Sequence, residues 1–302
     1  MADVLMVGSV ALDSVETPFG KVERALGGAA TYAGTAASFF APVKVVGVVG
    51  EDFAPEHLAF LQQRGVDTRG IETVAGGKTF HWAGRYSADM NSRDTLATEL
   101  NVFETFQPVL PAAHRAVPYV FLANIHPALQ LDVLDQMSAP RFVGLDTMNL
   151  WINIELATLL QVVARVQLLL LNDEEARLLT GESNLVAAGR KLLTMGPRAA
   201  IVKKGEHGAL MFTVDGLFAA PGFPLEVVKD PTGCGDCFAG GLMGCLAAAD
   251  ATDDDALRRA VVYGSVVASF NAQDFSLDRL RTLTRAEVDE RFAAFADLVR
   301  FA

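Results

Sequence analysis

Short runs of consecutive apolar residues recur along the chain, and between them lie longer stretches in which apolar residues return every three or four positions. The apolar runs span residues 4–11, 43–49, 119–123, 142–146, 168–171 and 199–202. Strands that are buried on both faces need apolar side chains at nearly every position, and such strands are typical of parallel sheets. Helical spacing is found in stretches at residues 29–37, 56–64, 129–137 and 155–163. This alternation predicts an α/β fold, with a mainly parallel sheet covered by helices on both faces.

The last third of the chain continues the pattern with shorter elements. Strands are predicted at residues 209–213, 217–219 and 225–228, and helices from Asp236 to about residue 248, at 261–269 and at 285–299. The acidic segment 250–255 suits the start of a helix, because carboxylates stabilise that end of the helix dipole. We find no internal repeat and no linker, and we therefore expect residues 1–302 to form a single domain.

Two segments depart from the strand–helix rhythm. Residues 14–26 and 71–106 contain turn signals and alternate between polar and apolar positions, as exposed strands do. The pattern predicts an antiparallel flap that stands off the main sheet, with Phe80, Trp82 and Tyr86 on one face. The alternative is an ordinary hairpin whose aromatic side chains fill the core.

Composition and charge narrow the classes of partner. The chain has 302 residues, a hydrophobic fraction of 51% and a formal net charge of -11. An acidic surface repels nucleic acids and anionic membranes, so neither is an expected partner. No apolar run reaches the roughly 18 to 20 residues that span a bilayer, and the first residues lack the pattern of a signal peptide. We expect a cytoplasmic location.

The most specific chemical signal is a glycine-rich turn between a strand and a helix. Residues 230–236 read Asp-Pro-Thr-Gly-Cys-Gly-Asp. Gly233 and Gly235 permit close approach to the backbone, and the free N–H groups at a helix start favour a phosphate. Asp236 either caps the helix or accepts a proton from a substrate hydroxyl beside that phosphate. The turn therefore predicts an anion site with a candidate general base.

Further polar residues follow other predicted strands. Asp13 comes after the first strand, where it either holds substrate hydroxyls or caps a turn. Gly27 and Gly28 open a small-residue helix, either for a ligand or for tight packing. Asn172 and Glu175 are three positions apart at a strand–helix junction. That spacing is suited to a hydrated Mg²⁺, and it is equally common as a helix cap.

The three cysteines lie close together, and two of them form a Cys-x-x-Cys pair. Cys234 and Cys237 flank the candidate base at a helix start. Thiolates are favoured there, which makes redox control one interpretation. The other interpretation is two small side chains that pack in a tight turn.

The residues 230–236, placed near the C-terminal third of about 300 residues, resemble the signature of the ribokinase (PfkB) family of carbohydrate and nucleoside kinases. The resemblance covers nearly the whole chain, because the other polar positions recur in the family's order. It implies a three-layer α/β/α sandwich with a mainly parallel central sheet and a small β-sheet lid, formed here by inserts at about 14–26 and 71–106.

The resemblance also implies residue roles. Asp236 is the implied base, and the implied anion hole is Gly233, Cys234 and Gly235. The implied substrate-binding residues are Asp13, Gly27 and Gly28, and Tyr32 stands at a further position of this kind. The pattern of the predicted flap adds Trp82 and Arg85 as expected substrate-binding residues. ATP is expected at Lys204, Gly205, Gly208, Asp230, Thr232 and Asn271, and Mg²⁺ at Asn172 and Glu175.

Three departures from the family pattern bear on the substrate and the turn. Tyr32 stands where the family usually has an Asn that holds substrate hydroxyls, Pro231 replaces a Thr, and Cys234 replaces an Ala that contributes only its backbone. The change at Tyr32 concerns the identity of the substrate more than the chemistry.

The function that follows is ATP-dependent phosphorylation of an alcohol, with Asp236 as general base. Polar residues at the predicted mouth, Arg85, Asp89 and Asn91, favour a sugar or cyclic polyol, while the flat rings of Tyr32 and Trp82 leave a nucleoside open. The expected partner is a small-molecule alcohol, with a homodimer through the lid as a further possibility.

Two other functions are disfavoured by the sequence. A dinucleotide-dependent oxidoreductase would need a Gly-x-Gly-x-x-Gly after the first strand, and Gly8 is followed by Ser-Val-Ala. A non-catalytic nucleotide sensor on the same fold is disfavoured by the intact Asp236.

Overall fold

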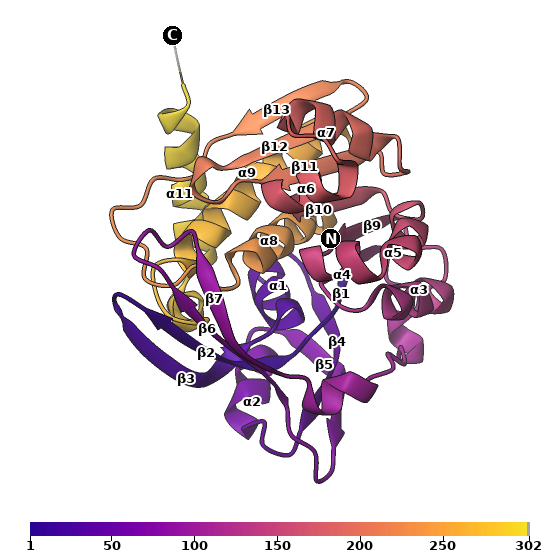
Figure 1. The fold of residues 1–302 in the computed structure, drawn as a ribbon, viewed down its shortest axis with the longest axis vertical. Helices are drawn as coiled ribbons and strands as arrows, with labels where there is room; N and C mark the ends of the chain where they lie inside the picture. Colours follow the sequence, from indigo (N-terminus) through magenta and orange to yellow (C-terminus); the bar gives the residue numbers. More distant parts are fainter. Residues whose placement is uncertain (301–302) are drawn as a thin grey trace.

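The computed structural model describes residues 1–300, and its centre is a nine-stranded sheet (Figure 1). The strand order is β13-β12-β11-β10-β9-β8-β1-β4-β5. The pairs from β11 to β5 are parallel, and β12 and β13 are added antiparallel at one edge. The strands are β1 (Val4–Val7), β4 (Val43–Gly50), β5 (Val66–Val74), β8 (Tyr119–Leu122), β9 (Phe142–Asp146), β10 (Leu168–Asn172), β11 (Ala199–Lys203), β12 (Ala209–Thr213) and β13 (Gly216–Ala220).

Helices cover both faces of this sheet, so the predicted three-layer sandwich is confirmed. Side chains that alternate along β1 divide between two hydrophobic clusters, with Val4 and Met6 in one and Leu5 and Val7 in the other. The first cluster packs against α1 (Ala29–Ala37), α2 (Pro55–Gln63), α8 (Cys234–Ala249), α9 (Asp254–Asn271), α10 (Asp278–Thr282) and α11 (Arg285–Leu298). The second packs against α3 (Pro127–Gln136), α4 (Asn149–Ile154), α5 (Leu156–Val163), α6 (Asp173–Thr180) and α7 (Leu185–Leu193).

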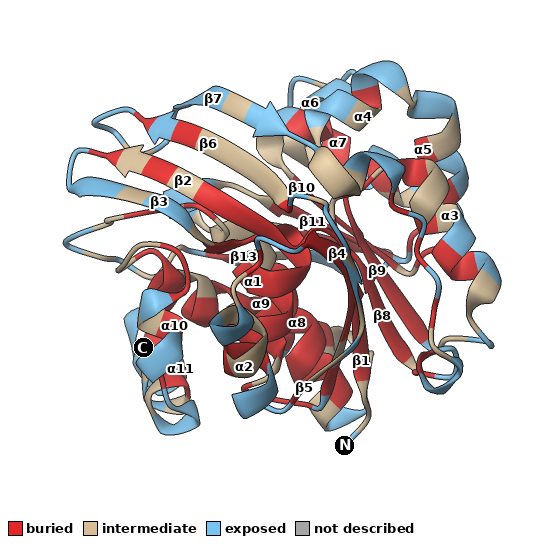
Figure 2. Ribbon diagram, turned by 90° about the horizontal axis from the view of Figure 1, so that it is seen from below, coloured by how far each residue is buried: buried red, intermediate tan, exposed pale blue. Residues whose placement is uncertain are grey.

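A second sheet of four strands stands off the main sheet, and we call it the lid sheet. It consists of β2 (Ala11–Thr17), β3 (Gly20–Gly27), β6 (Phe80–Tyr86) and β7 (Arg93–Glu99), in the order β3-β2-β6-β7. The predicted flap is wrong in one respect, because β2 and β6 pair in parallel and only the outer pairs are antiparallel. Figure 2 shows buried residues along β2 and mostly exposed ones on β3 and β7.

Three predicted elements need correction. The apolar run 4–11 is divided, because β1 ends at Val7 and the chain crosses into the lid sheet at Ala11. The segment predicted to begin the flap at residue 71 still belongs to β5, which pairs with β4 in the main sheet. Residues 225–228 form no strand, since β13 already occupies the sheet edge and Val227 is exposed.

Two remaining points concern the C-terminal end of the predicted domain and the possibility of a membrane-spanning helix. The single domain was predicted to run to residue 302, and residues 301 and 302 lie outside the described part. Within residues 1–300, every helix is too short or too polar to cross a membrane.

Candidate active site

The glycine-rich turn forms the start of α8. Gly233 is the N-cap residue with a φ of 75°, and the helix begins at Cys234, earlier than the predicted start after Asp236. Asp236 is consequently the third residue of the helix and not its cap. A Cβ on Gly233 would overlap the ring of Tyr32, and a Cβ on Gly235 would lie 3.3 Å from Lys203 Nζ. The turn thus needs glycine at these positions, and its first N–H groups have no partner within the helix.

Buried side chains hold this turn in place. The Asp230 carboxylate accepts hydrogen bonds from the Thr232 N–H at 2.8 Å and from the Ser276 N–H at 3.1 Å. The Asn271 amide donates to the Thr232 carbonyl at 2.7 Å. Asp230, Thr232 and Asn271 were predicted to bind nucleotide, but all three are buried and none lines the neighbouring cavity described below. Their contacts indicate that they position the turn.

Asp236 has the electrostatics of a general base that works near neutral pH. Burial, and after it the nearby charge of Asp146, raise the pKa of Asp236 to about 7, against the opposing effects of Lys203 and Arg93. A carboxylate with a pKa in this range can both hold and release a proton at neutral pH.

Lys203 supplies a cation that the sequence analysis missed. Its Nζ lies 2.7 Å from Asp146 Oδ2, and the two side chains are 17% and 7% exposed. The predicted lysine, Lys204, is absent from the cavity lining, while Lys203 is present. Strand alternation could have found this residue, because Ile201 and Lys203 share a side of β11 and Ile201 belongs to the cluster that packs against α8.

Asn172 and Glu175 meet at the start of α6, where they cap the helix. The Asn172 N–H donates to Glu175 Oε2 at 2.7 Å, and the Glu175 N–H donates to Asn172 Oδ1 at 2.8 Å. This is the capping alternative of the sequence analysis, and it leaves Glu175 Oε1 free. Residues 1–300 hold no group of three His, Cys, Asp or Glu that could enclose a metal.

The charges around Glu175 nevertheless fit a hydrated Mg²⁺. Burial and the charge of Asp146 raise the pKa of Glu175 to about 7, while Lys203 acts in the opposite direction. Glu175, Asp146 and Asp236 thus place three carboxylates around one buried lysine. Oxygen ligands with surplus negative charge suit Mg²⁺, which keeps several of its waters.

Asp13 and the glycine pair form the opposite end of the site. Asp13 is 5% exposed, and burial raises its pKa to about 7, with the Gly28 N–H favouring the ionised form and Asp230 and Asp236 opposing it. A Cβ on Gly27 would overlap the Asp13 carboxylate, and Gly28 has a φ of 94°. The glycines therefore allow the carboxylate to lie against the start of α1, as the ligand interpretation expected.

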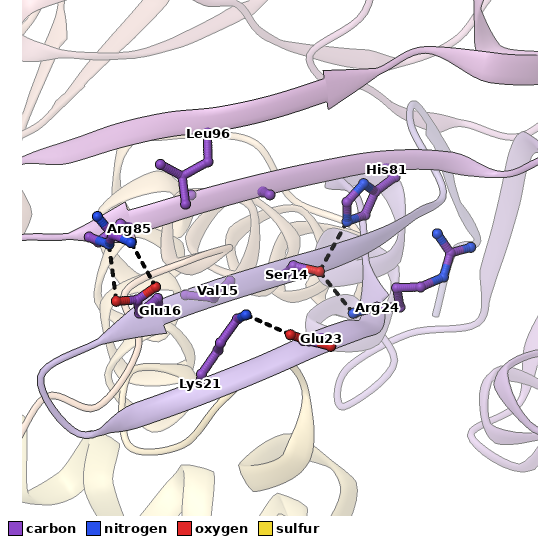
Figure 3. Close-up of a pocket in the computed structure, with 11 residues that line it drawn as sticks. Ser14, Val15, Glu16, Lys21, Glu23, Arg24, His81, Arg85 and Leu96 are labelled. Carbon is purple, nitrogen blue, oxygen red and sulfur yellow. Dashed lines mark hydrogen bonds and ion pairs between the residues drawn. The ribbon is translucent and has the colours of Figure 1, made fainter.

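The lid sheet places Trp82 and Arg85 on opposite faces. Trp82 pairs in register with Asp13, so its ring lies on the inner face of the sheet. Arg85 pairs with Glu16 in register, and its Nε lies 3.0 Å from Glu16 Oε1 on the outer face (Figure 3). The prediction that Arg85 binds substrate is wrong, because its 54% exposed side chain points away from Asp13.

Tyr32 is also placed differently from the prediction. It is 1% exposed, and its ring packs beneath Gly233. Its hydroxyl has no hydrogen-bond partner within the described part of the chain. Burial raises the pKa of Tyr32 well above its usual value. The ring has no open face on which a substrate could stack.

A cavity of about 450 Å³ adjoins the turn on the side of α9. Gly205, Gly208 and Lys203 border it, and so do the anion-hole residues Cys234 and Gly235. Apolar residues of the 222–228 segment and small residues of α9 form its far wall, and the tip of the lid sheet at residues 89–91 reaches its rim. A cavity that joins an apolar wall to an anion hole is suited to a nucleotide.

The chain is similar to known kinases over most of its length. The family model described as pfkB family carbohydrate kinase matches residues 1–278. A cytidine kinase of Thermococcus kodakarensis is 31% identical over 250 residues, which cover 80% of this chain and 88% of that protein.

Solved structures confirm the ribokinase-like fold. A nucleoside kinase of Burkholderia thailandensis in complex with inosine has a TM-score of 0.77 at 21% identity, with 97% of each chain covered. An E. coli structure with ATP and Mg²⁺, provisionally assigned as a ribokinase II, has a TM-score of 0.77 at 19% identity and covers 97% of this chain and 99% of the other.

Proposed function

Because the chain belongs to the pfkB family of carbohydrate kinases, which transfer phosphoryl groups to alcohols, we propose that it is an ATP-dependent nucleoside kinase. The observation that carries the choice of a nucleoside is the 31% identity to a cytidine kinase over 80% of this chain. Cytidine and related ribonucleosides are therefore the acceptors that we expect.

The reasons for preferring a sugar or polyol lose their support in the structure. That preference rested on three polar groups at the predicted mouth. Arg85 lies on the outer face of the lid sheet. Asp89 accepts hydrogen bonds within its own turn, from Ser87 and Asn91, and Asn91 also donates to Glu206 beside the cavity. Trp82 remains, and its ring can stack on a nucleobase above Asp13.

The transfer we propose uses the two ends of the site. Asp13 and the Gly28 N–H hold the ribose hydroxyls, which directs the 5′-hydroxyl toward Asp236. Asp236 takes the proton of the 5′-hydroxyl while the oxygen of this hydroxyl forms a bond to the γ-phosphorus. The bond from the γ-phosphorus to the β–γ bridging oxygen breaks, and ADP leaves. The N–H groups at the start of α8 and the Lys203 ammonium stabilise the charge on the phosphoryl oxygens.

The binding of ATP and Mg²⁺ follows from the surrounding residues. The cavity bordered by Gly205 and Gly208 is the proposed nucleotide site. Glu175, with Asn172 behind it, would hold Mg²⁺ largely through water, and the ion would neutralise charge on the ATP phosphates. Trp82 and its neighbours on the lid sheet would exclude water from the reacting groups.

A homodimer through the lid sheet is part of the proposal. The outer face of that sheet is hollowed by about 420 Å³ between β2, β3 and β6 (Figure 3), which offers a concave surface to a second copy. Sedimentation velocity of the full chain tests this, because a monomeric wild-type protein would contradict it.

The decisive assay is a substrate panel with ATP and Mg²⁺. We expect kcat/KM for cytidine to exceed that for free ribose by about 10² or more, because ribose has the hydroxyls but lacks the base that Trp82 would contact. Uridine, adenosine, inosine and a cyclic polyol complete the panel. Efficient turnover of ribose or the polyol alone would overturn the nucleoside assignment, and ATP binding without transfer to any alcohol would favour a sensor.

A further inference from the structure

Arg93 lies at the start of β7 and is not among the residues of the proposed transfer. Its cross-strand partner is Tyr86, and residues opposite each other in an antiparallel pair project from the same face of the sheet. Tyr86 is buried, and its hydroxyl lies 3.3 Å from the Thr232 hydroxyl in the glycine-rich turn. The contact fixes which way this end of the lid sheet faces, so Arg93 projects toward the turn.

One further contact and the electrostatics of the site agree with that direction. The Arg93 guanidinium carbon lies 5.7 Å from the centre of the Trp82 ring, and Trp82 is the inner-face residue in register with Asp13. The positive charge of Arg93 also acts on Asp236 and Glu175. It lowers the pKa of both carboxyl groups, whereas burial raises them. The side chain is thus close to the reacting end of the site.

Arg93 is exposed and forms no ion pair with any residue from 1 to 300. Arg85, on the neighbouring strand β6, is paired with Glu16 on the outer face. An arginine that faces a cleft of carboxylates without pairing to one is free to bind an anionic ligand. Its planar fork of donors matches the oxygens of a phosphoryl group.

We propose that Arg93 contacts the γ-phosphoryl group during its transfer, so that the lid sheet contributes a catalytic residue as well as a cover. The proposal rests on the kinase function given above. Arg93 stays protonated throughout, and it gains its contact as negative charge spreads over the equatorial phosphoryl oxygens. Lys203 approaches from the main sheet and Arg93 from the lid sheet, so the full positive charge is assembled only with the lid sheet in position.

The test compares Arg93→Gln with Arg85→Gln. Both variants remove one positive charge from the lid sheet, but from opposite faces. We expect kcat of Arg93→Gln to fall by about 10² to 10³, with KM for the acceptor changed by less than about threefold. Arg85→Gln should keep kcat within about twofold of the wild type, and Arg93→Lys should recover part of the loss.

A second readout separates contact with the transferring group from a structural role. ADP with aluminium fluoride and the acceptor mimics the transferring phosphoryl group, and a non-hydrolysable ATP analogue mimics the ground state. Arg93→Gln should weaken the first complex by about 30-fold or more, and the second by less than about threefold. Equal weakening of both complexes would overturn the proposal.

The outcomes also distinguish this inference from the proposed function. A wild-type enzyme that phosphorylates nucleosides while Arg93→Gln retains kcat within about threefold overturns the role of Arg93 alone. A wild-type protein that transfers no phosphoryl group to any alcohol overturns the proposed function, and the role of Arg93 falls with it. Equal losses in Arg93→Gln and Arg85→Gln would also overturn the role, since they would point to a general effect of charge on the lid sheet.

Discussion

Lys203 and Arg93 carry the same charge and approach Asp236 from opposite walls of the cleft, but their surroundings differ. Lys203 lies on the wall formed by the main sheet, which we call the sheet wall; its side chain is 17% exposed, and its Nζ lies 2.7 Å from Asp146 Oδ2. Arg93 lies on the wall formed by the lid sheet, which we call the lid wall, and is exposed. The sheet wall therefore has its charges fixed before any ligand arrives, whereas the lid wall presents charge that depends on the position of two strands. The Lys203 charge is in place before any ligand binds, and the Arg93 charge joins it at the reacting group when the lid sheet is in position.

The same contrast holds for the carboxylates. Burial raises the pKa of Asp236 on the sheet wall and of Asp13 at the mouth of the lid to about 7. Asp89 at the tip of the lid sheet has its pKa lowered by hydrogen bonds from Ser87 and from the Asn91 N–H. Burial thus separates the carboxyl groups that exchange protons near neutral pH from the exposed Asp89, which remains charged.

The largest expected effect concerns the sheet wall. Asp236→Asn should lower kcat by about 10² to 10⁴, because the acceptor hydroxyl loses its general base while the shape of the side chain is kept. Calorimetric titration with a non-hydrolysable ATP analogue should show nearly unchanged nucleotide binding. Wild-type turnover in this variant would remove Asp236 from the mechanism.

The next effect tests whether the fixed cation is Lys203. Lys203→Met should lower kcat by about 10². Lys204→Met provides a matched control, because Lys204 follows the end of β11 and does not border the cavity, and it should stay within about threefold of the wild type. Similar losses in both variants would contradict the assignment.

The Lys203 variant also needs a stability control. Removal of one partner from a buried ion pair leaves Asp146 uncompensated and destabilises the fold by about 3 kcal/mol. The double variant Lys203→Met/Asp146→Asn should recover much of that stability in urea unfolding but none of the activity. Recovery of activity would show that Lys203 acts only through folding.

A smaller effect concerns stability and pH at Asp13. Because the pKa of Asp13 is higher in the folded state than its usual value of 3.8, its contribution to stability is complete below about pH 4 and is lost as the pH rises through about 7. Asp13→Asn should therefore gain about 1 to 3 kcal/mol relative to the wild type at pH 8 and little at pH 4.5. Asp89→Asn, whose carboxylate is exposed, should show no such gain. Chemical unfolding at the two pH values measures the difference.

The smallest expected effect is at the cysteines. Burial raises the pKa of Cys234 to about 12 and that of Cys237 well above its usual value. Their thiols also contact different carbonyl groups, those of Ala268 and Tyr32. Treatment with diamide should leave activity unchanged, since little thiolate is present to react. Inactivation that dithiothreitol reverses would restore the redox interpretation.

The hydrophobic pattern located most of the main sheet because a strand buried on both faces is apolar throughout, as residues 142–145 and 168–171 are. It failed where strand pairing, and not burial, decides the structure. Residues 4–11 are apolar from end to end, yet the chain changes sheets within them. Residues 225–228 look like a strand but have no neighbour to pair with.

The part of the site that depends on backbone conformation could be predicted from the sequence. Gly233 and Gly235 are needed wherever a phosphate meets the start of α8, so the turn is visible in the sequence. Arg93 could not be found in this way, because its role depends on the register that places it beside Tyr86. Arg85 was misplaced for the same reason, since a single step along β6 moves a side chain to the other face.

The measurement that tests the account most directly is ³¹P NMR of the product formed from cytidine, ATP and Mg²⁺. The account predicts one molecule of ADP for each phosphorylated nucleoside, with a phosphorus signal split into a triplet by the two 5′ protons. This splitting identifies the 5′-hydroxyl as the acceptor, as expected if Asp13 holds the ribose and directs that hydroxyl toward Asp236. A doublet from a 2′- or 3′-phosphate, or ADP release without any phosphorylated nucleoside, would contradict the account.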